Sequence, residues 1–494
     1  MLALLPVLAA SASAAIVPNT PSLFIANGAH DTVPDCLKHS YHGSYGGSAA
    51  TQEHIYLPSA ECLSSSNLDS FTAGSIVPLE DLGSLEKGRI VWIGKAGVQG
   101  DGELPMDISA HSWPSMSEDG KEQGSPFVIQ SDDPRDTRKE PITLLHQTAN
   151  SFLLHVGASS LPYIDTLLPP YLVPVAVPTK PYPVAALGWE SVPTKYAKYL
   201  AGIIENLQFS PAIDRILSDG LDLNQVRRDV RWLTGESPSG IQSRHSFTPG
   251  AVKAAHWIQG KVEATGATCT LQPFLEGFSP NVICQYPSLQ NSTENVIFSA
   301  HYDSRGSFGS TRAPGGDDDG SGTGHLLGLA HAIGSQGVQF EKQVTLAFFA
   351  GEEQGLLGSH AYAEYLHSQN TSILLQVQAD MLGYHAVGES LQLGLPETIH
   401  LPEASYLVGN ISHLYAPELV VGTTAACCSD HQSFVSYGFP ATQVFERNGD
   451  IVDPMYHNSG DLSQREGYDF EQIVAIAKVT LATLLTVAGY QIAE

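Results

Sequence analysis

Basic side chains are scarce in this chain. Only 24 of its 494 residues are Lys or Arg, against 51 Asp or Glu, so the formal net charge at pH 7 is −27. Proteins that bind nucleic acid or anionic membrane surfaces use basic residues to neutralise phosphate groups. The charge therefore argues against a nucleic-acid partner and against a membrane partner.

Long hydrophobic runs are also missing. After residue 15, no stretch reaches the roughly 18 apolar residues that a membrane-spanning helix needs. The longest candidate, residues 473–488, contains Lys478 and several Thr, and is predicted to be a final amphipathic or buried helix. Residues 1–15 (MLALLPVLAASASAA) combine a short apolar run with small residues, which is typical of a secretory signal peptide. They lack a basic start, so a buried N-terminal helix is the alternative.

Cysteines are few but even in number, and secreted proteins commonly pair such a set as disulfides. Their spacing suggests the pairs Cys36–Cys62 and Cys269–Cys284 and leaves Cys427 and Cys428 adjacent, either as a vicinal disulfide or as two thiols. The sequons are at Asn291, Asn370 and Asn410, where N-glycans are expected. These features predict a secreted, extracellular glycoprotein.

The composition changes near residue 200. Residues 16–200 are rich in Pro, Gly and Ser with short strand-like runs, which predicts a β-rich accessory domain or pro-segment. As a pro-segment, it would cover the site until proteolysis near its proline-rich end released it.

Residues 201–494 alternate buried strands with helices, which favours an α/β domain. We expect a mixed, largely parallel central sheet flanked by helices. The expected strands are residues 296–300, 344–350, 374–379 and 441–445, and the expected helices are residues 200–232, 248–258, 322–333 and 356–366.

Polar residues follow the buried strands of this second domain, where ligands collect in α/β sheets. They are His301, Asp303, Glu352, Glu353, Asp380 and His457, with the aspartates of residues 317–319 in an intervening loop. Imidazole and carboxylate without thiolate suit Zn²⁺, Mn²⁺ or Co²⁺. Two histidines and three carboxylates are too many for one open four-coordinate ion, and suit two ions about 3.5–4 Å apart with a bridging carboxylate.

The motifs in this region resemble those of the secreted co-catalytic di-zinc aminopeptidases of the leucyl-aminopeptidase type. Glutaminyl cyclases and glutamate carboxypeptidases are wider relatives. The matching motifs are HYDS (301–304), PGGDDDGSG (314–322), AGEEQGLLGS (350–359), QADMLGY (378–384), CCSDH (427–431) and YHNSGD (456–461).

The resemblance implies two Zn²⁺ per chain. His301 and Asp380 would bind one ion, Glu353 and His457 the other, and Asp318 would bridge them, followed by a cis peptide bond. Glu352 would be the general base that takes a proton from the zinc-activated water and gives it to the leaving amine. Asp303 and Asp430 would support the ligands, Asp303 by accepting the second N–H of His301.

Two positions depart from the family pattern. Thr424 stands where relatives carry the first cysteine of a disulfide, and Ala426 stands where relatives carry a tyrosine that helps to stabilise the tetrahedral intermediate. Another donor must take over that task, or the reaction is slower.

The resemblance predicts a metalloaminopeptidase that acts on peptides with a free N-terminus. The alternatives are a one-zinc glutaminyl cyclase, which would use fewer ligands, and a carboxypeptidase, which would need basic residues for the terminal carboxylate. Arginines near the motifs are few: Arg305, Arg312 and Arg447. A catalytically inactive binding ectodomain is the third alternative.

Overall fold

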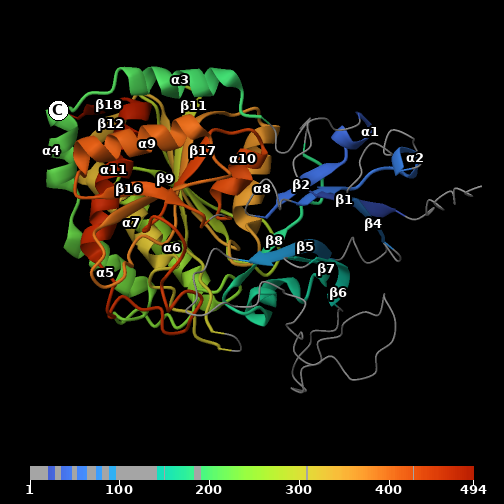
Figure 1. The fold of residues 1–494 in the computed structure, drawn as a ribbon. Helices are drawn as coiled ribbons and strands as arrows, with labels where there is room; N and C mark the ends of the chain where they lie inside the picture. The colour runs from blue at the N-terminus through green and yellow to red at the C-terminus, as the bar shows by residue number, and fades with distance from the viewer. Residues whose placement is uncertain are drawn as a thin grey trace, which may run out of the picture.

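The computed structural model describes residues 21–27, 35–46, 53–63, 74–79, 88–95, 142–148, 151–182 and 191–493, except 308–309 and 427. The predicted signal peptide (1–15) lies outside these residues. Figure 1 shows a large α/β body formed by the C-terminal residues, with the blue and teal strands of the N-terminal residues beside it.

The α/β body is built on a six-stranded sheet. Its strand order is β17 (Ala441–Val444), β14 (Ser372–Ala379), β11 (Glu294–His301), β13 (Gln343–Phe349), β10 (Asn281–Tyr286) and β9 (Thr268–Gln272). The first four strands run parallel, and β10 and β9 run antiparallel to their neighbours. Helices α7 (Gly320–Ser335) and α8 (Leu357–Ser368) supply the crossovers that parallel strands need. The predicted mixed, largely parallel sheet is confirmed.

One face of this sheet carries most of the helices. They are α3 (Thr194–Glu205), α4 (Pro211–Gly220), α5 (Leu223–Leu233), α6 (Pro249–Glu263), α7, α9 (Pro402–Tyr415) and α11 (Phe470–Ala488). The single helical stretch expected over residues 200–232 is wrong in detail, because Ser210 and Asp222 cap new helices within it. Helix α11 is long and apolar enough to span a membrane, but most of it is buried in this core, which confirms a buried final helix.

The other face is covered by α8, α10 (His431–Ser436) and an N-terminal sheet. That antiparallel sheet has the order β2 (Tyr41–Tyr45), β3 (Glu53–Tyr56), β1 (Ser22–Asn27) and β4 (Gly74–Pro78). Phe24 and Tyr56 join the same hydrophobic cluster as Phe349 of β13 and Phe434 of α10. The N-terminal residues therefore share a core with the α/β body.

A second antiparallel sheet completes the N-terminal region. Its order is β6 (Ile142–Gln147), β7 (Ser151–Gly157), β5 (Gly88–Lys95) and β8 (Leu172–Ala176). Both sheets confirm the β-rich prediction. At the edge of β8, the Ala176 amide donates to the carbonyl of Gly355, 3.3 Å away, in the α/β body.

The remaining elements are short. They are helices α1 (Asp35–Lys38) and α2 (Ala60–Leu63), 3₁₀ turns Leu161–Tyr163 and Asp165–Leu167, and strands β12 (Val338–Phe340), β15 (Gln392–Pro396), β16 (Val420–Thr424) and β18 (Tyr490–Ile492).

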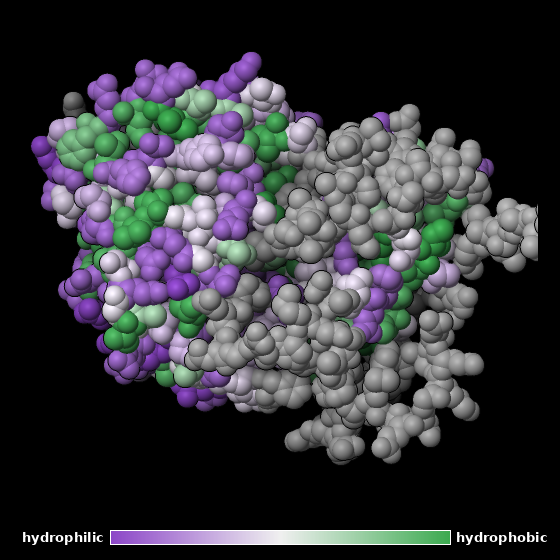
Figure 2. Space-filling view, in the orientation of Figure 1, coloured by the Kyte–Doolittle hydropathy of each residue, from purple (hydrophilic) through white to green (hydrophobic). Residues whose placement is uncertain are grey.

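The predicted disulfides Cys36–Cys62 and Cys269–Cys284 are both present. Cys427 lies outside the described residues, so its pairing stays a prediction. On the face of the α/β body seen in Figure 2, hydrophilic and hydrophobic residues are interspersed. All three sequon asparagines are exposed.

Candidate metal centre

The predicted ligands meet at the carboxyl edge of the parallel strands. His301 is the last residue of β11, Asp380 follows β14, and Glu352 and Glu353 follow β13. Gly351, with φ of 73°, makes the turn that takes the chain out of β13. Parallel neighbours end on the same side of a sheet, so three segments far apart in sequence come together here.

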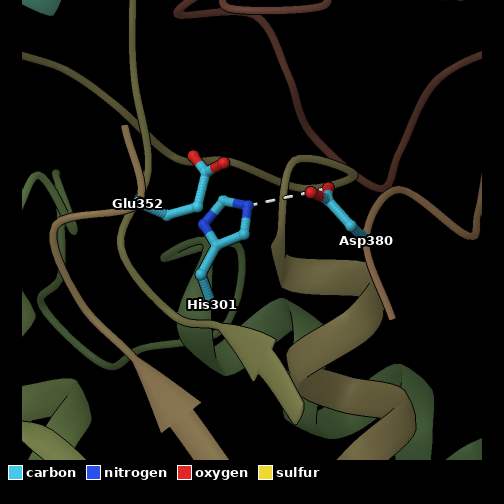
Figure 3. A group of neighbouring side chains, drawn as sticks. All are labelled: His301, Glu352 and Asp380. Carbon is cyan, nitrogen blue, oxygen red and sulfur yellow. Dashed lines mark ion pairs between the residues drawn. The ribbon is translucent and has the colours of Figure 1, made fainter. Parts of the chain in front are cut away.

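His301, Glu352 and Asp380 form one group of side chains that could hold a metal ion. Figure 3 shows the carboxylate of Glu352 above the ring of His301 and that of Asp380 to the right of the ring, with Nε2 turned toward Asp380. The distance from His301 Nε2 to Asp380 Oδ1 is 3.6 Å.

Asp318, Glu353 and His457 form the second such group. His457 Nε2 lies 3.1 Å from Asp318 Oδ2 and 3.2 Å from Glu353 Oε2. The other oxygen of Asp318, Oδ1, lies 3.2 Å from His301 Nε2. One carboxylate therefore faces both histidines, with one oxygen toward each.

The loop around Asp318 is held by its neighbours. The peptide bond between Asp318 and Asp319 is cis, as the resemblance implies. Asp319 caps α7 by accepting from the Gly322 amide, and it also accepts from the amide of His301. Asp317 accepts from the Gly383 amide. These two aspartates bind backbone and leave the middle one to face the histidines.

Asp303 and Asp430 lie behind the metal-facing residues and are fully buried. Asp303 Oδ1 is 3.4 Å from His301 Nδ1, on the opposite side of the ring from Asp318. Asp430 accepts from Gln378 of β14, and its charge contributes to raising the pKa of Glu352.

The charges of the centre perturb one another. Burial raises the pKa of Glu352 well above its usual range, and the charge of Glu353 adds to this effect. Burial acts to lower the pKa of His301, but Glu352 and Asp380 outweigh it and raise that pKa well above its usual range. Burial acts to raise the pKa of Asp318, but the two histidines outweigh it and lower that pKa. Four carboxylates around two imidazoles leave a negative excess that a cation would offset.

The donor set fits metal ions. His301 Nε2 and Glu353 Oε1 are buried without a hydrogen-bond partner in the part of the chain that the structure describes. Buried polar atoms normally have a partner, so such orphans call for a ligand. Imidazole nitrogen and carboxylate oxygen are donors that zinc accepts.

A pocket opens onto both groups. Its charged lining comprises Asp318, Glu352, Glu353, Asp380 and His457, and the rest of the lining comprises Val173, Pro174, Met381, Ala426, Cys428, Ser429, Gln443, Phe445, Ile451 and Tyr456. Among these lining residues there is no Lys or Arg. The pocket is thus acidic at the metal groups and mostly apolar elsewhere.

Three contributions to this site were not predicted. Val173 and Pro174 come from β8 of the N-terminal region. Tyr456 stacks on the ring of His457, with centroids 3.7 Å apart, and packs against a cluster that contains Ala426. Arg305 Nη1 lies 2.8 Å from His457 Nδ1. The YHNSGD motif contained the signal for Tyr456, since it directly precedes a predicted ligand.

Known proteins resemble this chain over the region of the site. Residues 281–484 match the model of peptidase family M28. Leucine aminopeptidase 1 of Metarhizium robertsii is 30% identical over 297 residues, which cover 56% of this chain and 73% of that protein. A probable leucine aminopeptidase of Arthroderma otae is also 30% identical over 297 residues, covering 58% and 77%.

The fold is shared with a solved structure, the LapA aminopeptidase of Legionella pneumophila. The TM-score is 0.57 at 18% identity, and the likeness covers 71% of this chain and 95% of that one. This share exceeds what residues 201–494 alone would supply, so the shared fold extends into the N-terminal region. The resemblance first drawn from the motifs is confirmed: the chain belongs to peptidase family M28.

Proposed function

We propose that the protein is a secreted zinc aminopeptidase, which hydrolyses the N-terminal peptide bond of peptides that have a free N-terminus. The observation that carries the proposal is the position of Asp318, whose two oxygens lie 3.2 and 3.1 Å from the Nε2 atoms of His301 and His457. A carboxylate shared in this way is the arrangement expected of a two-metal hydrolase.

Each ion would have its own ligands. His301 and Asp380 would hold one zinc ion, Glu353 and His457 the other, and Asp318 both. Zinc, when bound, would polarise the scissile carbonyl and lower the pKa of the attacking water. Asp303 would fix the ring of His301 from behind, since a histidine that binds metal commonly donates its other N–H to a carboxylate.

Glu352 would move the proton. Its side chain is half-buried and lines the pocket, whereas that of Glu353 is buried. Its carboxylate would take a proton from the attacking water and pass it to the leaving amine. A raised pKa brings a carboxylate closer to the working pH, which suits a group that must both accept and donate.

The pocket favours a substrate with a positive end. The α-ammonium of a peptide would find carboxylates and no competing Lys or Arg among the described lining residues. Met381, Phe445 and Ile451 would surround an apolar N-terminal side chain. The names of the fungal relatives, leucine aminopeptidases, agree with such a residue.

The arginines disfavour a carboxypeptidase. The Arg305 guanidinium donates to the carbonyls of Leu168 and Leu172, and Arg447 pairs with Glu389 at 2.9 Å. Neither lines the pocket, so neither is placed to bind a terminal carboxylate. A cyclase that binds one zinc ion would not use all five of the proposed ligands, so the ligand set disfavours this alternative.

Secretion agrees with the two disulfides, because such bonds persist in oxidising compartments. The exposed sequons at Asn291, Asn370 and Asn410 would then carry N-glycans.

Metal content per chain is the first test, by elemental mass spectrometry of the purified protein. We expect about two zinc ions per chain in the wild type and fewer in Asp318→Ala. The control is Asp219→Ala, the same substitution at an exposed position, which should keep the zinc content of the wild type. One zinc ion per chain would instead favour the glutaminyl cyclase. No bound zinc, even after zinc is added, would favour the catalytically inactive ectodomain.

Activity is the second test, on leucyl anilide and its N-acetylated form. We expect cleavage of the free amine only. Equal cleavage of both forms would contradict an aminopeptidase.

A further inference from the structure

Strand β8 belongs to the N-terminal sheet but reaches the metal centre. Val173 and Pro174 line the same pocket as Asp318, Glu352 and His457. No metal-ligand motif lies in this part of the sequence, so its share in the site comes from the fold alone.

The segment before β8 binds Arg305 with its backbone. The guanidinium of Arg305 donates to the carbonyls of Leu168, Leu172 and Pro169, at 2.5, 3.1 and 3.3 Å. Its side chain is buried, and in the part of the chain that the structure describes these three carbonyls are its hydrogen-bonding oxygens. Without this segment, the guanidinium would lose these acceptors, which is costly for a buried charge.

Arg305 and this segment together face His457. Arg305 Nη1 is 2.8 Å from His457 Nδ1, and the carbonyl oxygen of Pro170 is 3.2 Å from the same nitrogen. The opposite nitrogen, Nε2, faces Asp318 and Glu353. A histidine that binds zinc through Nε2 keeps its hydrogen on Nδ1, and the Pro170 carbonyl can accept it, whereas the guanidinium of Arg305 can only donate. Residues 168–172 therefore support the far side of a predicted zinc ligand, and Arg305 holds these residues in place.

Two further contacts tie this segment to the α/β body. Asp165 and His245 form a buried hydrogen bond, with 2.8 Å between Oδ2 and Nε2. The Ala176 amide donates to Gly355, four residues from the start of the turn that carries Glu352 and Glu353. A segment that is removed for activation would be expected to cover the pocket, whereas this one forms its side and braces its ligands.

We propose that residues 168–174 are a permanent wall of the active site. Val173 and Pro174 limit the size of the N-terminal residue that the pocket accepts. The Pro170 carbonyl positions His457 by accepting from Nδ1, and Arg305 anchors the segment that carries this carbonyl. The inference rests on the proposed function and makes the N-terminal region a working part of the enzyme rather than a disposable pro-segment.

Substrate size is the first test. The variants are Val173→Ala and Val173→Phe, assayed on alanyl, leucyl and phenylalanyl anilides. The control is Val175→Ala, which removes the same two methyl groups from the same strand but from the hydrophobic cluster of the N-terminal sheets. We expect Val173→Phe to shift the ratio of kcat/KM toward alanine by about tenfold and Val173→Ala to shift it toward larger residues, with no change in the control. If the Val173 variants are active but their kcat/KM ratios are unchanged, the proposal that Val173 limits the pocket is wrong. If the wild type has no aminopeptidase activity, the proposed function is wrong instead.

Zinc affinity is the second test and does not need activity. Chelator titration of Arg305→Ala is compared with that of Arg447→Ala, a control at an arginine outside the site. We expect the ion at His457 to bind about 10–100-fold more weakly while the ion at His301 is retained, because the unanchored segment no longer holds the Pro170 carbonyl against His457 Nδ1. Arg305→Lys can still donate to the carbonyls of the segment and should recover part of the affinity. Loss of both ions together, or of neither, would refute a positioning role.

The third test is the intact mass of the active secreted protein. We expect the mature form to retain residues 168–174. An active form that begins after residue 190 would overturn the inference.

Discussion

Glu352 and Glu353 are adjacent in the chain, but replacing each by Gln is expected to produce different defects. Glu353 is 3% exposed, and its Oε2 lies 3.2 Å from His457 Nε2, on the ligand side of the turn. Glu352 lies near His301 and Asp380 and lines the open pocket. We propose Glu353 as the ligand and Glu352 as the proton carrier.

The Gln substitution keeps the size and shape of both side chains and removes the charge. A general base contributes about 10²–10⁴-fold to the rate, so Glu352→Gln should lower kcat by that factor, which corresponds to about 3–5 kcal/mol of the activation free energy. KM should change little, because the carboxylate acts in the transition state. Zinc content should stay at two ions per chain.

Glu353→Gln should instead lose an ion. A neutral amide is a weaker ligand than a carboxylate, so zinc content should fall toward one per chain, and added zinc should restore part of the activity. Both variants are measured by elemental mass spectrometry and by steady-state kinetics on leucyl anilide, with Glu364→Gln, at a more exposed position of α8, as the control. If Glu352→Gln loses zinc and Glu353→Gln keeps it, the two roles are exchanged and the assignment is refuted.

Three further predictions concern neighbours of the ligands. Asp303→Ala should weaken zinc binding by about 10–100-fold in a chelator titration, because the ring of His301 loses its rear acceptor; unchanged affinity would contradict this. Tyr456→Phe should lower kcat by about 10²-fold with little change in KM if its hydroxyl replaces the donor missing at Ala426, and equal kcat would exclude it. Burial raises the pKa of Asp317 to about 7, so the folded state holds its proton where the unfolded state has released it. The stabilisation from Asp317 is therefore full below pH 4 and is lost as the pH rises toward 7. In thermal unfolding of the metal-free protein, Asp317→Asn should flatten the fall in Tm over that range, and an unchanged slope would count against it.

Three of the five proposed ligands, His301, Glu353 and Asp380, could be predicted because each one follows a recognisable strand, whereas Asp318 and His457 lie in loops and were recognised from their motifs. His301 and Asp380 come directly after runs of buried apolar residues, and the structure places both at the carboxyl edge of one sheet. The order of the strands in the sheet did not have to be known for this prediction, because the carboxyl ends of parallel strands lie on the same side of a sheet. The helical stretch at 200–232 was harder, because two caps within it outweigh its continuous apolar pattern.

The role of β8 could not be read from the sequence. Val173 and Pro174 are ordinary strand residues, and the groups that bind Arg305 are backbone carbonyls, which every residue possesses. These residues and carbonyls lie at the metal centre only because the fold brings together residues that are more than 100 positions apart in the sequence. Tyr456 is an intermediate case, because its motif was visible but its packing against Ala426 was not.

The hydrogen bond between Ala176 and Gly355 joins the turn after β13 to a sheet whose hydrophobic clusters contain few residues of the α/β body. Regions with separate clusters can open at different free energies, as hydrogen exchange detects in many proteins. If the sheet that contains β8 opens first on heating, the wall and its hold on Arg305 are lost while most of the proposed zinc ligands stay on an intact α/β body. Thermal inactivation would then precede both zinc release and the main unfolding transition, and the working temperature of the enzyme would be set by the part of the chain that carries none of its ligands.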